Sequence, residues 1–420
     1  MKRDLFANHS IALQPHAPLR QGELQQGRLR VAFVTETYPP EVNGVALTVA
    51  RVVSGLRARG HEMQLVRPRQ ETDGARGGAD ARELLVSGLP IPRYPHLKMG
   101  LPAGRLLARV WTANRPDVVH VATEGPLGYS AANAARRLGI AVTSDFRTNF
   151  HAYTRHYGIG WLARPILGYL RAFHNHTATT MVPTEALRCQ LTMEGFDNLV
   201  VVGRGVDAGR FDPSHRSEEL RRTWGAGPEQ PVALYVGRLA SEKNLGLLVR
   251  SFHAISLAQP AARLVLVGDG PMRESLRSAL PEAVFAGQRH GADLAAHYAS
   301  ADLFVFPSLT ETFGNVTPEA MASGLAVVAY DHAAAAQLIR PGQSGVLVAC
   351  GNEAQFVRSA VALANSRALR ESMGALARLH VSHHGWDAVL GRFESVLRHA
   401  LQRQTHAQPT SAARMQMPAP

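Results

Sequence analysis

Residues 232–244 read VALYVGRLASEKN, and this stretch decides the fold class because it restarts a pattern that the chain has already used once. An apolar, β-branched run ends at Val236, a loop from Gly237 to Asn244 follows, and LGLLVRSFHAISL then repeats apolar residues at helical spacing. A buried strand, a loop and a helix in this order open a βαβ unit. The stretch therefore predicts a second α/β domain behind the first.

The first round of the pattern begins with LRVAFVTETYPP, where residues 29–34 form an apolar run that leads into a proline and glycine loop ending at Gly44. GVALTVARVVSGLRARG has helical spacing, and Met63 to Val66 supplies the next strand. We predict further strands within residues 117–125, 140–146, 179–184, 262–271, 283–287, 302–308 and 325–330. The fold class is therefore α/β, with two doubly wound, Rossmann-like domains whose ligands bind at the carboxyl ends of the strands.

Composition limits the partners and the compartment. The 420 residues carry 45 Lys and Arg against 33 Asp and Glu, a net charge of +12 that attracts anions. Nucleic acid is disfavoured, since no reader motif occurs and aromatic content is only 6%. The two cysteines, Cys189 and Cys350, give no disulfide framework, so we expect a cytoplasmic protein. No apolar run reaches the about 20 residues that span a bilayer, so any membrane contact is expected to be peripheral.

Two loops at strand ends suit a phosphate. In YPPEVNGV, Gly44 precedes a helix, where backbone amides hold anions, although a glycine there often serves turn geometry alone. In VGRLASEKN, Arg238 and Lys243 could clamp a diphosphate, or they could form a solvated basic loop with Glu242 as a local partner.

A third loop, TETFGNVTPEAMASG at residues 310–324, contains two carboxylates. Thr317 before Pro318 predicts a helix start, with an earlier start at Gly314 as the alternative. Glu319 then favours the helix dipole, but Glu311 precedes the helix and would repel a phosphate unless it binds another part of the ligand. Sugar hydroxyls are the natural partner for such a carboxylate.

These loops, together with LVGDGP and YASADLFVFPS, resemble in sequence and order the retaining glycosyltransferases of family four, which have the two-domain GT-B fold. The resemblance covers residues 29–400. It implies an N-terminal, acceptor-side domain and a C-terminal domain that binds a nucleotide-sugar. The expected segments are a disordered lead (1–28), the two domains (29–203 and 204–382), a helix crossing back to the first domain (383–403) and a disordered tail (404–420).

The resemblance also assigns roles to residues. Arg238 and Lys243 would bind the diphosphate and stabilise the leaving nucleotide, and Glu311 would hold the donor sugar. Gly44 would approach the reacting phosphate and sugar, and Glu319 would hold the ribose hydroxyls. Further donor contacts are expected from Phe313, Gly314, Asn315 and Val316, with Arg289 in AGQRHGADL near the nucleobase.

One position departs from the family. Many relatives have Phe-His-Thr near the reacting sugar, whereas SDFRTNFHAY places Arg147 there. Arg147 either packs against a neighbouring residue or contacts the donor sugar or an anionic acceptor.

The resemblance implies transfer of a hexose, best assigned as mannose from GDP-mannose, to a lipid or glycolipid without a metal or other cofactor. The alternatives are a UDP-sugar donor, and a protein that binds nucleotide-sugar or anionic membrane without catalysis. Two segments, residues 97–115 and 160–173, combine arginines with Trp111, Trp161, Tyr169 and Phe173. They favour peripheral contact with an anionic inner membrane face, or they are amphipathic helices packed on a sheet.

Overall fold

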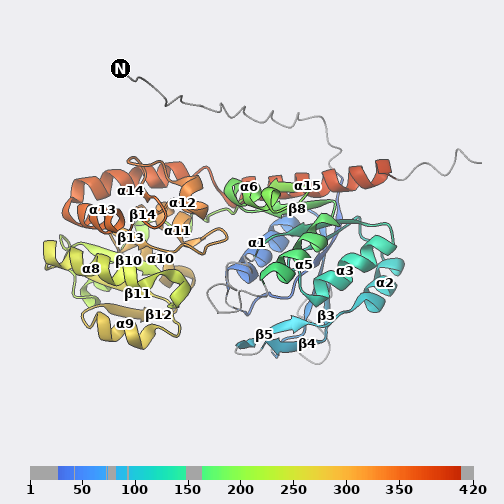
Figure 1. Ribbon diagram of the computed structural model, residues 1–420, viewed down its shortest axis with the longest axis horizontal. Helices are drawn as coiled ribbons and strands as arrows, with labels where there is room; N and C mark the ends of the chain where they lie inside the picture. The colour runs from blue at the N-terminus through green and yellow to red at the C-terminus, as the bar shows by residue number, and fades with distance from the viewer. Residues whose placement is uncertain are drawn as a thin grey trace, which may run out of the picture.

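The computed structural model describes residues 27–407 except 42, 72, 74–81, 92–93 and 148–162. The chain forms two lobes, each a parallel sheet with helices on its faces (Figure 1). The predicted disordered lead falls almost wholly outside the described residues, as does most of the predicted tail.

The N-terminal sheet has seven parallel strands in the order β3-β2-β1-β6-β7-β8-β9. The order reverses direction at β1, so the loops after β1 and β6 open at a switch point where ligands bind in such sheets. The strands are β1 (Arg30–Val34), β2 (Glu62–Pro68), β3 (Glu83–Val86), β6 (Val118–Val121), β7 (Ala141–Asp145), β8 (Thr179–Val182) and β9 (Leu199–Val201). The helices are α1 (Gly44–Ala58), α2 (Gly104–Ala113), α3 (Pro126–Arg137), α5 (Ala163–Asn175) and α6 (Glu185–Met193).

The C-terminal sheet has six parallel strands in the order β12-β11-β10-β13-β14-β15. The strands are β10 (Val232–Val236), β11 (Arg263–Val267), β12 (Val284–Gly287), β13 (Leu303–Phe306), β14 (Ala326–Tyr330) and β15 (Val346–Val348). The helices are α7 (Glu218–Thr223), α8 (Leu245–Ala258), α9 (Arg273–Ala279), α10 (Gly291–Ala299), α11 (Val316–Ala322), α12 (Ala333–Leu338), α13 (Glu353–Asn365) and α14 (Arg367–Val381), with 3₁₀ turns η2 (Pro213–His215) and η3 (Ser241–Lys243).

The last helix, α15 (Trp386–Ala407), leaves the C-terminal lobe and lies along the N-terminal one (Figure 1). It packs on α1, where a Cβ at Gly55 would stand 2.3 Å from Leu390 Cδ1, so only glycine permits this close crossing. Beside the crossing, Val206 N donates to His384 O at 3.0 Å. The two chain crossings between the lobes therefore lie side by side.

Several elements were not predicted from the sequence. These are the short strands β3, β9 and β15 and the antiparallel hairpin of β4 (Gly88–Ile91) and β5 (Tyr94–Gly100). The predicted helix start at Thr317 is wrong: α11 begins at Val316 with Asn315 as its N-cap, and Thr317 is buried inside the helix. Helix α15 extends four residues beyond the predicted end at residue 403.

Candidate active site

Two loops of the C-terminal domain meet through an ion pair between residues that lie 68 positions apart. Lys243, at the end of η3 after β10, donates to Glu311 Oε1 at 2.5 Å, and Ser308 Oγ donates to the same oxygen at 2.8 Å. Both charged side chains are mostly buried, with 13% and 15% of their area exposed. Lys243, which was predicted to bind the diphosphate, and Glu311, which was predicted to bind the donor sugar, therefore contact each other.

This pairing controls the charge of Glu311. Burial alone would raise its pKa, but the ammonium of Lys243, the Ser308 hydroxyl and nearby His332 hold the pKa below its ordinary value. The loop itself is fixed because Thr310 Oγ1 donates to Glu242 O at 2.9 Å. Glu311 is thus an anion held in one position, suited to accept hydrogen bonds from hydroxyl groups.

Arg238 lies at the start of the same loop as Lys243 and is more open to solvent. Its side chain is 39% exposed and pairs with buried Glu242 at 3.5 Å, while Tyr235 Oη donates to its carbonyl oxygen at 3.1 Å. The neighbouring glycine loop packs backbone to backbone: a Cβ at Gly268, where φ is +134°, would stand 2.0 Å from Gly237 O. The glycines of VGR and LVGDGP therefore bring two strand-end loops together beside the cations.

Glu319 lies in the first turn of α11, behind the loop that carries Glu311. It accepts a hydrogen bond from the hydroxyl of fully buried Tyr298 at 2.9 Å. Burial raises its pKa to about 7, and Tyr298 and Arg210 oppose that rise. Gly314 has φ +89°, a left-handed conformation that glycine adopts without strain, and it turns the chain from Glu311 into the helix. The two glutamates consequently lie on either side of one tight turn.

Gly44 brings the N-terminal domain to the same turn. It is the first residue of α1, whose N-cap Asn43 accepts a hydrogen bond from Ala46 N at 2.8 Å. A Cβ at Gly44 would lie 3.7 Å from Asn315 Nδ2, on the other domain. Predicted donor-binding residues from both domains thus approach each other where the domains meet.

Arg147 follows β7 and is buried, with 8% of its area exposed. Its guanidinium pairs with Asp145, whose other partner is His120 Nε2 at 3.2 Å. Burial would raise the pKa of Asp145, but Arg147 and His120 lower it to about 2. Arg147 is therefore held by an ionised partner within the N-terminal domain.

Arg289, which was predicted to lie near the nucleobase, bonds to residues three and four positions away in the chain. Its guanidinium donates to Asp293 at 3.1 Å and to Ala286 O at 2.8 Å, and 40% of the side chain is exposed. Phe313 is buried and Val316 half-buried, both beside the Gly314 turn.

Three buried or half-buried charged residues were not predicted from the sequence. Glu36 follows β1 and Glu124 follows β6; burial raises the pKa of Glu36 to about 7 and that of Glu124 to about 8, the latter aided by the charges of Glu36 and Asp145. Their positions at strand ends could have identified them, as the carboxyl edge of a parallel sheet binds ligands. The third, Arg204, lies in the segment that connects the domains.

The described residues include no cluster of three His, Cys, Asp or Glu side chains arranged to hold a metal ion.

Known families match both halves of the chain. The family described as Glycosyltransferase Family 4 matches residues 42–210, and Glycosyl transferases group 1 matches residues 230–366. The chain belongs to glycosyltransferase family 4.

Relatives and solved structures extend the match over most of the chain. A GDP-mannose-dependent alpha-mannosyltransferase of Mycobacterium tuberculosis is 37% identical over 88% of this chain and 97% of its own length. A GDP-mannose-dependent alpha-(1-6)-phosphatidylinositol monomannoside mannosyltransferase of the same species is 29% identical over 88% and 98%. The structure of sucrose-phosphate synthase from Thermosynechococcus elongatus superposes with a TM-score of 0.69 at 17% identity, covering 90% of this chain and 100% of that one. The GT-B fold is therefore confirmed, and the protein is a glycosyltransferase.

Proposed function

We propose that this glycosyltransferase moves mannose from GDP-mannose to a lipid or glycolipid acceptor. The observation that carries the proposal is the meeting of Lys243, Glu311 and Asn315 on one domain with Gly44 on the other. Cations and closely approaching backbone suit the diphosphate of a donor, and a fixed carboxylate suits the sugar of the same donor. The choice of GDP-mannose rests on the 37% identical relative of that name.

The proposed chemistry needs positioning and charge rather than a covalent intermediate. Departure of the nucleotide diphosphate leaves negative charge on its phosphate, which Arg238 and Lys243 stabilise best where closed domains exclude water. Glu311 accepts hydrogen bonds from donor-sugar hydroxyls, and Glu319 accepts them from the ribose. We expect retention of configuration and no metal requirement.

A panel of nucleotides and nucleotide-sugars tests the donor. GDP and GDP-mannose are expected to raise the melting temperature of the full chain, because a ligand at 100 times its Kd adds about 2.7 kcal/mol to the free energy of unfolding. UDP and UDP-glucose at equal concentration should give smaller shifts. Larger shifts with the UDP compounds would show that the donor is a UDP-sugar. Binding of GDP-mannose without slow hydrolysis would favour a protein that binds nucleotide-sugar without catalysis.

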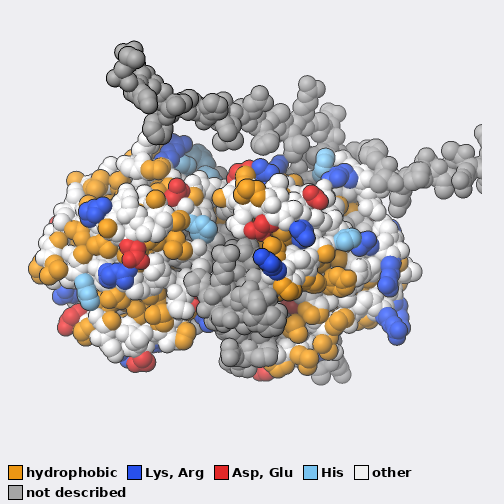
Figure 2. Space-filling view, in the orientation of Figure 1, with side chains coloured by type: hydrophobic (Ala, Val, Ile, Leu, Met, Phe, Trp, Pro, Cys, Tyr) orange, Lys and Arg blue, Asp and Glu red, His pale blue; other side chains and the backbone are white. Residues whose placement is uncertain are grey.

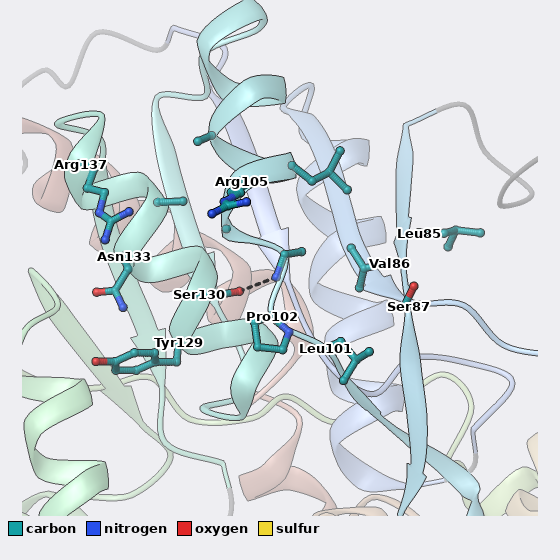
Figure 3. A pocket seen from close by; sticks show the side chains of 15 residues that line it. Leu85, Val86, Ser87, Leu101, Pro102, Arg105, Tyr129, Ser130, Asn133 and Arg137 are labelled. Atoms are coloured by element: carbon teal, nitrogen blue, oxygen red, sulfur yellow. Dashed lines mark hydrogen bonds between the residues drawn. The ribbon is translucent and has the colours of Figure 1, made fainter.

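The acceptor side is proposed to include a groove on the N-terminal domain. The groove has a volume of about 810 Å³ and lies between the end of β3, α2 and α3. Figure 3 shows Leu101 and Pro102 within it, with Arg105, Tyr129, Asn133 and Arg137 around them. Figure 2 shows Lys and Arg side chains gathered over the edge of this lobe where α2 and α3 lie, next to hydrophobic ones. Apolar and basic side chains together suit an anionic bilayer surface.

The structure divides the aromatic residues of segments 97–115 and 160–173 between the core and the surface. Trp111 is fully buried and donates to Gln64 at 2.8 Å, and Phe173 is 4% exposed, so both belong to the core. Trp161 lies outside the described residues, whereas Tyr169 and Tyr129 are 42% and 49% exposed. Among the described helices, none is both long and apolar enough to cross a bilayer.

Charge reversal of Arg105 and Arg109 on α2 tests the proposed membrane contact. The double variant R105E/R109E is expected to lose about tenfold or more in binding to phosphatidylglycerol vesicles at low salt, since each basic residue contributes about 1 kcal/mol. Arg250 and Arg277, each 53% exposed on the C-terminal domain, provide the matched control R250E/R277E. Equal losses in both variants, or no vesicle binding by the unmodified protein, would contradict contact through this face.

A further inference from the structure

Arg204 connects the two domains at the cleft. It follows β9 in the crossover segment and donates from Nη1 to Thr48 Oγ1 at 3.2 Å, one turn into α1. Its guanidinium carbon lies 6.0 Å from the ring centre of Phe313, on the C-terminal domain beside the Gly314 turn. Arg204 therefore contacts the acceptor-side domain and the donor-binding loop at once.

Arg204 has no ion-pair partner within 4 Å among the described residues. Its guanidinium donates instead to the neutral Thr48 hydroxyl. Burial and the charge of Arg147 lower its pKa to about 9, while the charges of Asp145 and Glu311 oppose this, so the arginine still carries its charge at neutral pH. A half-buried cation without an ion-pair partner is costly, and a ligand that supplies negative charge lowers that cost.

Arg147 adds a second cation to the same place. Arg147, Arg204 and Thr48 line one small cavity, and Arg147 Nε is buried without a hydrogen-bond partner. Asp145 neutralises Arg147 and is shared with His120, so the two arginines retain an excess positive charge. The cavity holds about 20 Å³, room for about one water, so a larger anion would not fit inside it and would reach the arginines from outside.

The positive charge of Arg204 and Arg147 lies apart from the residues that we assign to the donor phosphates. Lys243 and Arg238, which we assign to the diphosphate, belong to the C-terminal domain. Arg204 and Arg147 lie at the carboxyl edge of the N-terminal sheet. Arg204 is near enough to Glu311 for the two charges to interact. Since Glu311 is assigned to the transferred sugar, the arginines are on the acceptor's side of that sugar.

We propose that Arg204, together with Arg147, binds an anionic group, a phosphate or a carboxylate, carried by the acceptor. This inference rests on the proposed transfer to an acceptor and adds that the acceptor is charged close to the hydroxyl that attacks. The paired arginines orient that group by charge-assisted hydrogen bonds from the acceptor-side domain.

Inorganic phosphate in the presence of saturating GDP is the probe. With the diphosphate site filled by GDP, calorimetry of the full chain is expected to show one further phosphate bound, with a Kd in the millimolar range. Arg204→Gln should raise that Kd by about tenfold or more, because it removes a charged hydrogen-bond donor, and should change the Kd of GDP by less than about threefold. Arg204→Lys, which keeps the charge, should recover part of the phosphate affinity.

Arg51→Gln is the matched control, because Arg51 also pairs across the domains, with Asp207 at 3.0 Å, in a more exposed position. It should leave phosphate binding unchanged. Phosphate that only displaces GDP, or an Arg204→Gln variant that loses GDP affinity as strongly as phosphate affinity, would overturn the proposal by assigning Arg204 to the donor. Failure of the donor assignment itself would show separately, as absence of GDP binding by the unmodified protein; the same titration would then be run with UDP.

Discussion

Lys243→Ala is expected to lower kcat by about 10² to 10³-fold at saturating donor, because it removes a fixed cation from the place where charge develops on the leaving phosphate. The affinity for GDP should fall as well, since the same ammonium contacts the diphosphate in the ground state. The loss has a second component. Glu311 would remain buried without its ion-pair partner, and its pKa would rise. Steady-state turnover of GDP-mannose and calorimetry with GDP measure both effects.

Lys98→Ala is the control for this substitution. Lys98 lies on β5 of the N-terminal domain, and its side chain donates to Arg69 O at 3.2 Å, outside the C-terminal loops that carry Arg238, Lys243 and Glu311. Its removal should leave kcat and GDP affinity nearly unchanged. An unchanged kcat for Lys243→Ala at saturating donor would show that the assigned phosphate clamp is wrong.

The position of the site could be predicted from the sequence, but its internal contacts could not. Strand-end loops are recognisable because apolar runs end in glycine, and the carboxyl ends of parallel strands share one edge. This reasoning identified Gly44, Lys243 and Glu311. It could not identify the bond between Lys243 and Glu311, because the strands that carry them, β10 and β13, become neighbours only in the folded sheet.

Other differences between the sequence-based predictions and the structure have equally local causes. For Trp111 the sequence left open a membrane surface or an amphipathic helix packed on the sheet, and the second is found: α2 turns the ring into the core and leaves Arg105 and Arg109 outside. Thr317 resembles an N-cap before proline, but Asn315 takes that place since the Gly314 turn starts the helix earlier. Arg204 lies in a short polar linker, where nothing in the sequence shows that two domains close around it.

Glu311→Gln is expected to separate recognition of the sugar from recognition of the nucleotide. The amide keeps the shape of the side chain but loses the charge that accepts hydrogen bonds from sugar hydroxyls, so kcat/KM for GDP-mannose should fall by about 10²-fold or more. Affinity for GDP should instead stay equal or increase, because a negative charge is removed beside the diphosphate and Lys243 is released from its ion pair.

Glu319→Gln provides the comparison for Glu311→Gln, since Glu319 is assigned to the ribose, which GDP and GDP-mannose share. It should weaken both ligands by similar factors, whereas Glu311→Gln should affect GDP-mannose alone. Calorimetry with GDP and initial rates with GDP-mannose for the two variants give four values to compare. If Glu311→Gln weakens GDP as much as it impairs GDP-mannose turnover, the carboxylate acts on the nucleotide side, and its assignment to the transferred sugar fails. Opposite responses of the two ligands would instead place the sugar between Glu311 and the acceptor-side domain, where the arginine pair lies.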